Sequence, residues 1–271
     1  MLVNEIDFKS LGKKKILVAE DVELNQYLIK KILESWGFEV VIACNGSAAL
    51  QVFQQDSFDC ILMDVQMPVM DGIQATQFIR ELPDPVKAAV PIIAFTANTL
   101  QGDKEEYIKA GMDDYLAKPF DEKNLFLVIS RNLASKNPLD STSSAAKTNN
   151  KMNKDLNSDI RLYDLSLVES VSGGDAGFIK KMIVLFIKTV PQNVQELTKG
   201  LETENWEQVR KMAHKLKSTV DSMGIKSIHD EIRLVESNAK QQVSLHEIPA
   251  MIHHIEAVIN KCIKQLQAEI G

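Results

Sequence analysis

The sequence contains few cysteines, and none of them belongs to a short paired motif. Its 271 residues include three, Cys44, Cys60 and Cys262, and no two of them form a CxxC pair. An odd and scattered set excludes a disulfide framework. We expect reduced thiols that pack as small buried hydrophobes, as is usual in a cytoplasmic protein.

The sequence also lacks a long apolar run. No run approaches the roughly 20 residues that cross a bilayer, and the first ten residues contain no signal-peptide core. With 45% apolar residues, 12 Gly and 8 Pro, the composition is that of an ordinary globular protein and excludes collagen-like and disordered chains. We therefore expect a cytoplasmic location without direct membrane contact.

Basic residues are not in excess. The chain has 31 Lys and Arg against 37 Asp and Glu, which gives a formal net charge of −6. Binding to DNA or RNA depends mainly on cations that neutralise phosphates. We therefore expect no nucleic-acid partner, and we expect the partners to be proteins or cations.

The chain length suggests about two domains, and a polar segment divides the sequence. Residues 135–158 are rich in Ser, Asn, Thr and Lys and nearly free of large apolar side chains. This composition is typical of a flexible linker. We predict one domain over 14–134, the linker over 135–158 and a second domain over 160–270.

Short apolar runs alternate with helix-like periodicity in the first domain. The expected strands are 15–19, 38–43, 59–63, 91–95 and 114–117. The expected helices are 25–36, 48–55, 73–80, 100–110 and 122–133. This alternation predicts an α/β domain with a five-stranded, parallel, doubly wound sheet.

The second domain shows only helical periodicity. Apolar residues recur at intervals of three and four along 178–197, 204–223, 225–239 and 248–266. Four such segments joined by short turns predict an all-α domain, an antiparallel four-helix bundle. A brief helix is expected before it, around 164–170.

Polar side chains gather where the expected strands end. Glu20 and Asp21 follow the first strand, Asp64 ends the third, Thr96 ends the fourth and Lys118 follows the fifth. The carboxyl ends of parallel strands share one edge of a sheet, and clustered carboxylates require a cation such as Mg²⁺. The pattern predicts phosphoryl transfer onto Asp64, with Mg²⁺ and Lys118 neutralising charge and Thr96 donating a hydrogen bond.

Four segments carry a family resemblance. The stretches VAEDVELN (18–25), ILMDVQMPVMDG (61–72), AFTAN (94–98) and DDYLAKPF (113–120) resemble the signature segments of two-component receiver domains, which have a flavodoxin-like fold. The resemblance covers about 14–134. It implies that Asp64 is the phospho-acceptor.

The same resemblance implies further roles. Asp21, Asp64 and the backbone carbonyl of Gln66 would bind Mg²⁺, and Glu20 would act mainly through metal-bound water. Thr96 and Lys118 would sense the phosphoryl group, Tyr115 would change rotamer with them, and a cis peptide would join Lys118 to Pro119. Gln66 is a common variant at its position. Its presence does not determine the lifetime of the acyl phosphate.

One histidine of the second domain lies beside an apolar seam. The seam passes through Ala213, so His214 lies about 100° further round the helix, near Arg210, Lys211, Lys217 and Ser218. This placement predicts a solvated, cationic face with an exposed imidazole that carries a phosphoryl group. It also predicts that Lys217 faces water.

The segment AHKLKSTVDSMGI (213–225) resembles the core motif of histidine-phosphotransfer domains, over about 160–270. The matching residues are His214, Lys217, Ser218 and Gly224, and Ser218 stands where many members have Gly. The resemblance implies that His214 carries the phosphoryl group and that Lys217 assists it.

Together the two resemblances imply a phosphorelay, as at the C-terminal end of hybrid sensor histidine kinases. Asp64 would exchange a phosphoryl group with His214 in the same chain or with a partner. The expected partners are a histidine kinase as phosphodonor and a downstream receiver. The chain would be a phosphotransfer intermediate without an ATP-binding kinase domain of its own. The sequence does not decide whether it is an enzyme.

Several alternative functions compete with this interpretation. The chain could be a fragment of a hybrid kinase, or its helical domain could serve only as a protein-interaction output. An aspartate-nucleophile phosphatase requires a DxD element, whereas Gln66 occupies the second acidic position. A transcription factor requires a basic recognition helix, and an autonomous kinase requires a phosphate-binding loop that SLGKKK (10–15) does not match.

Overall fold

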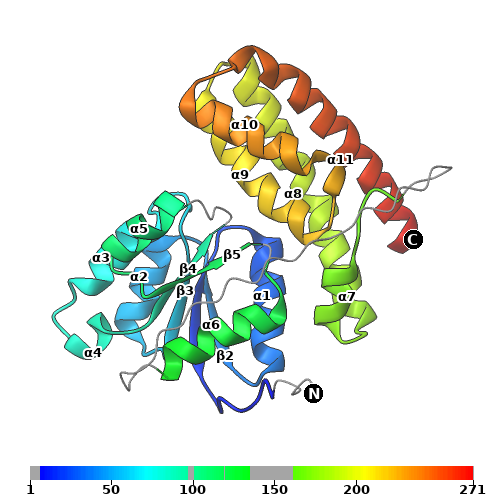
Figure 1. Cartoon of the computed structure of the whole chain (residues 1–271). Coiled ribbons are helices and arrows are strands. Elements are labelled where there is room, and N and C mark those ends of the chain that lie inside the picture. Colours follow the sequence, from blue (N-terminus) through cyan, green and yellow to red (C-terminus); the bar gives the residue numbers. More distant parts are fainter. Residues whose placement is uncertain (1–6, 97–100, 119, 135–160, 271) are drawn as a thin grey trace.

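The computed structural model describes residues 7–96, 101–118, 120–134 and 161–270. The predicted linker at 135–158 lies outside these residues, and so does Pro119 with its predicted cis peptide. Figure 1 shows an α/β domain followed by a helical domain. None of the described helices is both long enough and apolar enough to cross a membrane.

The first domain alternates strands and helices. The strands are β1 (Lys15–Ala19), β2 (Glu39–Ala43), β3 (Cys60–Asp64), β4 (Ile92–Thr96) and β5 (Asp114–Ala117). The helices are α1 (Glu23–Ser35), α2 (Gly46–Gln55), α3 (Gly72–Arg80), α4 (Pro85–Ala88), α5 (Gln101–Lys109) and α6 (Glu122–Ala134). The short α4 was not predicted; it begins at a proline and is capped by the carboxylate of Asp84.

All neighbouring strands are parallel, in the order β2-β1-β3-β4-β5. The predicted five-stranded doubly wound sheet is therefore confirmed. The chain leaves β1 toward β2 on one side and returns to β3 on the other, so the topological switch point lies between β1 and β3. Ligands of such sheets bind beyond the carboxyl ends of the strands at this point.

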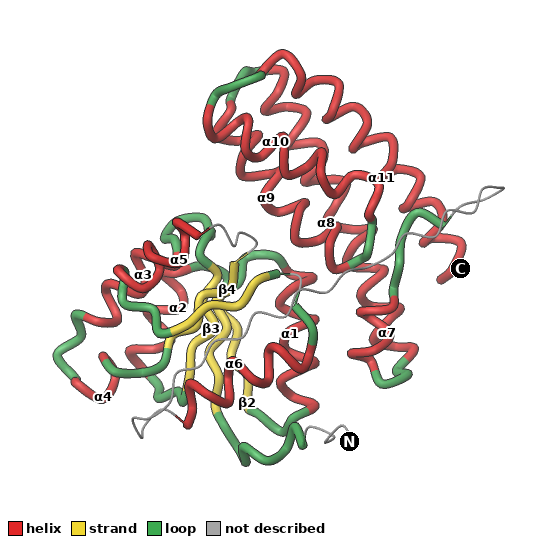
Figure 2. Tube along the Cα trace, viewed as in Figure 1, coloured by secondary structure: helices red, strands yellow, loops and turns green. Residues whose placement is uncertain are grey.

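Helices lie on both sides of the sheet, as Figure 2 shows, and most strand residues are buried. Alternate strand residues serve two hydrophobic clusters: Ile16 and Val18 pack with α1 and α6, whereas Leu17 and Ala19 pack with α2 and α3. This alternation follows from the two-residue period of a strand. It explains why the strands read as continuous apolar runs.

The second domain consists of helices. They are α7 (Ser166–Ser172), α8 (Ala176–Glu202), α9 (Trp206–Ser222), α10 (His229–Gln241) and α11 (Ile248–Ile270), with short 3₁₀ turns at Lys226–Ile228 and Leu245–Glu247. The four long helices form the predicted bundle, and α7 is the brief helix expected before it. Buried residues of all four, such as Phe186, Leu216, Val235 and Ile255, supply one apolar core.

The glycine at the end of the segment 213–225 has a steric role. Gly224 follows α9 with φ of +61°, and a Cβ at this position would lie 2.4 Å from the carbonyl oxygen of Asp164. The backbone N–H of Asp164 also donates to the carbonyl of Met223. Glycine therefore lets the segment before α7 pack directly on the end of α9.

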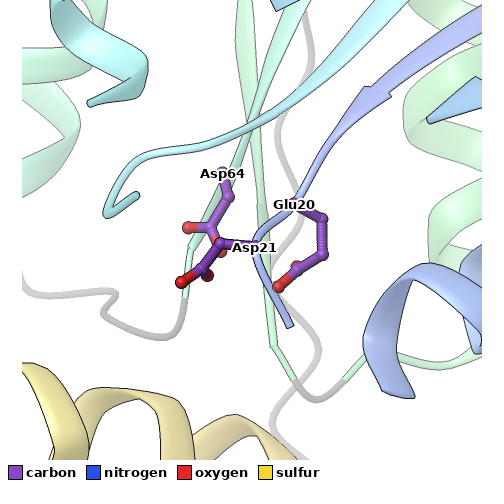
Figure 3. A group of neighbouring side chains, drawn as sticks. All are labelled: Glu20, Asp21 and Asp64. Carbon is purple, nitrogen blue, oxygen red and sulfur yellow. The ribbon is translucent and has the colours of Figure 1, made fainter. Parts of the chain in front are cut away.

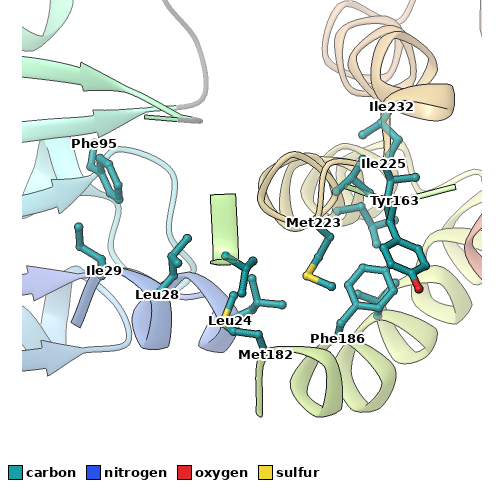
Figure 4. Close-up of a cluster of buried hydrophobic side chains, with 14 of the residues drawn as sticks. Leu24, Leu28, Ile29, Phe95, Tyr163, Met182, Phe186, Met223, Ile225 and Ile232 are labelled. Atoms are coloured by element: carbon teal, nitrogen blue, oxygen red, sulfur yellow. The ribbon is translucent and has the colours of Figure 1, made fainter. Parts of the chain in front are cut away.

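The two domains meet along α1. The ring of Tyr27 stacks on Phe178 with centroids 4.9 Å apart, and Lys31 pairs with Asp175 at 3.0 Å. Figure 4 shows Leu24 of α1 within the same buried cluster as residues of the bundle. The apolar core thus continues from one domain into the other.

The cysteine prediction was partly wrong. Cys60 and Cys262 are buried, whereas Cys44 is exposed. Cys44 directly follows β2, where the chain leaves the sheet toward α2. Cys44 therefore lies in the turn between β2 and α2, where its thiol is exposed.

Candidate functional site

Three carboxylates from two adjacent strands converge at the switch point. Glu20 and Asp21 follow β1, and Asp64 is the last residue of β3. One oxygen of each lies within 4.8 Å of the other two, and Figure 3 shows the three side chains together. Glu20 and Asp64 are almost fully buried. Their mutual repulsion must be offset by cations.

Lys118 supplies one cation from the end of β5. Its Nζ binds Asp64 Oδ2 at 2.6 Å and also pairs with Glu20 Oε2. Burial raises the pKa of Asp64 to about 6, although the charge of Lys118 opposes this rise. Burial disfavours the ammonium of Lys118, but the charges of Asp64 and Glu20 outweigh it and raise its pKa. The two groups therefore stabilise each other as an ion pair.

Glu20 is fixed by further donors. Its Oε1 accepts hydrogen bonds from the backbone N–H of Val22 at 3.1 Å and from the side-chain amide of Asn25 at 3.2 Å. Both donors lie at the start of α1. The acidic site is thus held by the turn between β1 and α1 as well as by β3.

The carboxylate cluster fits a hard divalent cation. Asp21 Oδ1 is buried and has no hydrogen-bond partner among the described residues. A buried acceptor of this kind is costly unless a donor or a cation reaches it. Carboxylate oxygens at this spacing are the ligands that Mg²⁺ prefers. Asp21 and its two neighbours therefore have the chemistry of a magnesium site.

The predicted sensing residues lie on the neighbouring strands. Thr96 is buried at the end of β4, and its hydroxyl lies 3.2 Å from the hydroxyl of Tyr107. Tyr115 is half-buried on β5, and the ammonium of Lys104 lies 5.1 Å from the centre of its ring. The backbone N–H of Gln66 donates to Asp64 Oδ1 at 3.1 Å. Tyr107 is a neighbour of Thr96 that the sequence argument did not identify.

The face around His214 is not the solvated surface that the sequence predicted. His214 and Lys217 are buried, with 9% and 4% of their surfaces exposed. Nδ1 of His214 lies 2.7 Å from Glu236 Oε1, and Lys217 pairs with the other oxygen of Glu236. The prediction of an exposed face was wrong because α10 and the first domain pack over this face of α9.

Glu236 determines the electrostatics of this face. Burial opposes its ionisation, but the hydrogen bond from His214 and the charges of His214 and Lys217 lower its pKa to about 2. An ionised carboxylate only accepts hydrogen bonds. The proton of a neutral His214 ring therefore lies on Nδ1, and Nε2 keeps a free lone pair.

The neighbouring cations are paired as well. Arg210 and Lys211 both contact Glu207, one turn earlier on α9, at 2.8 and 3.4 Å. Arg210 also donates from Nη1 to Gln66 Oε1 at 3.1 Å. The cationic cluster that the sequence predicted is therefore largely neutralised, and one of its members reaches the other domain.

His214 and one member of the acidic cluster, Asp21, line the same cleft. A cavity of about 540 Å³ is lined by Asp21 and Gln66 from one domain and by His214 and Lys215 from the other. Lys215 Nζ lies 2.9 Å from Asp21 Oδ2. Ser222 also donates to Asn25 Oδ1 at 3.4 Å.

Three residues of this arrangement were not identified from the sequence. Glu236 directly follows Val235 of an apolar seam. An acid at this position could have been identified as a candidate site residue. Lys215 adjoins His214, but nothing in its spacing indicates a partner in another domain. Asn25 lies in the VAEDVELN segment, yet its contact with Glu20 requires the turn geometry.

An acidic strand-end site facing a helical imidazole defines a class of two-domain phosphotransfer proteins. The response regulator receiver domain model matches residues 16–130, and the Hpt domain model matches residues 181–269. The chain thus contains a receiver domain followed by a histidine-phosphotransfer (Hpt) domain. These are the domains of phosphorelay signal transduction.

Relatives of known description carry the same region. The signal transduction histidine-protein kinase BarA of Shigella flexneri is 28% identical over 255 residues, which are 93% of this chain and 27% of BarA. The aerobic respiration control sensor protein ArcB of Escherichia coli K12 is 30% identical over 247 residues, 90% of this chain and 29% of ArcB. The chain therefore spans less than a third of either relative.

A solved receiver domain is also similar. It belongs to the sensor histidine kinase PA1611 of Pseudomonas aeruginosa PAO1 and holds a magnesium ion in its active-site cleft. It is 41% identical, covers 45% of this chain and 99% of its own, and has a TM-score of 0.43.

Proposed function

We propose that Asp64 accepts a phosphoryl group and exchanges it with His214 of the same chain. The observation that carries this proposal is the cleft lined by both His214 and Asp21 of the acidic cluster, with Lys215 in contact with Asp21. Because Asp21 lies beside Asp64 in the acidic cluster, this arrangement supports direct transfer between Asp64 and His214.

The transfer step balances without an added reactant. The lone pair of His214 Nε2 attacks phosphorus while the bond from phosphorus to the carboxylate oxygen of Asp64 breaks, so Asp64 becomes a carboxylate again. The proton stays on Nδ1, and the imidazolium that forms is stabilised by Glu236. Lys217 holds Glu236 from its other oxygen. The reverse step uses the same groups.

The acidic cluster would hold Mg²⁺ during this exchange. Asp21, Asp64 and the backbone carbonyl of Gln66 would be its direct ligands, and Glu20 would act through a bound water. When bound, Mg²⁺ neutralises charge on the phosphoryl oxygens. The unpartnered oxygen of Asp21 supports this assignment.

The remaining site residues would read the phosphorylated state. Lys118 and the hydroxyl of Thr96 would bind phosphoryl oxygens, since both lie at the same strand edge as Asp64. Tyr115 would change rotamer with them. Its half-buried ring next to Lys104 supports a side chain with room to move.

The wider setting follows from the two domain types. We infer a histidine kinase as phosphodonor, a downstream receiver as acceptor, a cytoplasmic location with reduced thiols, and domain bounds at 14–134 and 160–270. The relatives favour a region of a hybrid histidine kinase over a free relay protein. A helical domain used only for protein interaction is the alternative, and it predicts no label on His214.

The test is a phosphotransfer time course with a phosphorylated donor kinase and Mg²⁺. Wild type is compared with Asp64→Asn and His214→Gln. We expect base-labile label on Asp64 and acid-labile label on His214. Transfer within one chain is independent of protein concentration, whereas a mixture of the two variants transfers only at a concentration-dependent rate. Label on Asp64→Asn, incubated with the donor kinase and without the other variant, would overturn the acceptor assignment.

A further inference from the structure

Lys215 places a cation of the bundle in the acidic site of the receiver. It follows His214 on α9, and its Nζ lies 2.9 Å from Oδ2 of Asp21, whose side chain is only 5% exposed. Among the described residues, no other ion pair joins a cation of the bundle to this carboxylate cluster. Arg210, another bundle cation that lines the cleft, binds the neutral amide of Gln66.

The negative charge of the cluster can be balanced by one further cation, but not by Lys215 and Mg²⁺ at once. Glu20, Asp21 and Asp64 carry three negative charges against the single ammonium of Lys118. Either Lys215 or Mg²⁺ brings this balance close to neutrality. Both together would leave an excess of positive charge in a largely buried site, which is unfavourable.

We propose that Lys215 couples docking of the Hpt domain to the state of the receiver site. In the metal-free receiver, Lys215 anchors α9 on Asp21 and adds to the contacts along α1 that hold the two domains together. Mg²⁺ binding to the unphosphorylated site weakens this contact by repelling the ammonium. This inference rests on the proposed phosphotransfer function, and it assigns Lys215 as a positioning residue of that reaction.

Phosphorylation restores the contact. Conversion of Asp64 to an acyl phosphate replaces one carboxylate charge by up to two phosphoryl charges. Mg²⁺, Lys118 and Lys215 together then match the negative charge of the phosphoryl group, Glu20 and Asp21. Docking is thus favoured in the Mg²⁺-loaded receiver when it carries the group to be transferred, and disfavoured when it does not.

The coupling is reciprocal and has a measurable size. If docking weakens Mg²⁺ binding, Mg²⁺ weakens docking by the same factor. A single charge a few ångströms from a partly screened metal site changes affinity by about tenfold. Removal of the ammonium of Lys215 should therefore tighten Mg²⁺ binding by about this factor in the full chain.

Calorimetric titration of Mg²⁺ into the full chain tests the first half of this inference. We expect Lys215→Met to bind Mg²⁺ about tenfold more tightly than wild type, and Lys215→Arg to stay near wild type because the charge is kept. Lys211→Met is the matched control, since Lys211 lies on the same helix and pairs with Glu207. Equal affinities for Lys215→Met and Lys211→Met would overturn the inference.

Small-angle scattering tests the second half. Mg²⁺ should expand wild type, and Mg²⁺ with beryllofluoride, a mimic of the aspartyl phosphate, should make it compact again. Lys215→Met should show neither change. A wild-type scattering profile that stays unchanged after both additions would also overturn the inference. Because these measurements involve no transfer, the phosphotransfer assay can fail or succeed independently of them.

Discussion

Nδ1 of His214 lies 2.7 Å from the carboxylate of Glu236, and this contact orients the imidazole toward the receiver. We expect Glu236→Gln to slow phosphoryl transfer to His214 by about ten- to hundredfold, because the amide cannot stabilise the imidazolium that forms. Single-turnover transfer from the phosphorylated receiver measures this effect. Glu231→Gln is the matched control, since Glu231 pairs with His254 instead. An unchanged rate in Glu236→Gln would remove Glu236 from the mechanism.

Lys217 contributes to stability as well as to transfer. The residue is 4% exposed, and its ammonium pairs with Glu236. Loss of one partner of a buried ion pair leaves the other poorly compensated. We expect Lys217→Ala to lower the free energy of unfolding by about 2 kcal/mol, as measured by urea denaturation. Lys211→Ala, at an exposed position, should cost less than about 0.5 kcal/mol; equal losses would contradict the buried pair.

The low pKa of Glu236 makes this contribution depend on pH. Its pKa falls from an ordinary value near 4.5 to about 2 in the folded protein. A depressed pKa stabilises the folded state above the unfolded pKa, and the contribution is lost as the pH falls from about 4.5 toward 2. The stability difference between wild type and Glu236→Gln should therefore be largest near pH 7 and shrink below pH 4. A difference that stays constant to pH 2.5 would exclude this linkage.

Gly224 provides a test of the motif glycine. Ala at this position would bring its Cβ within 2.4 Å of the Asp164 carbonyl oxygen, in addition to the cost of positive φ. We expect Gly224→Ala to destabilise the protein by about 3 kcal/mol. Gly173→Ala is the control, because Gly173 has a similar φ of +57° with nothing within 4 Å. It should cost only about 1 kcal/mol. Thermal unfolding by calorimetry compares the two, and equal costs would exclude the steric role.

The sequence predicted what depends on local periodicity and strand order. The alternating apolar runs give the parallel sheet, and parallel strands bring Asp21, Asp64 and Lys118 to one edge. The exposure of His214 could not be predicted in this way. It depends on Glu236, which lies 22 residues later on another helix, and on packing between two domains. Periodicity identifies which side of a helix avoids its own core, but not what covers that side.

The contact between Tyr27 and Phe178 should control transfer without touching the reacting groups. Their rings stack 4.9 Å apart, and Lys181 lies 4.5 Å from the centre of the Tyr27 ring. Truncation of this aromatic contact removes about 1 kcal/mol or more of docking energy. We expect Tyr27→Ala to slow transfer within the chain by about tenfold. Uptake of phosphate by Asp64 from a small phosphodonor should stay unchanged, because that step needs no Hpt domain. Phe78→Ala is the control, since Phe78 is an exposed aromatic on α3, which packs on the other face of the sheet. If both variants transfer at the wild-type rate, the α1 face does not hold the domains in their transfer geometry.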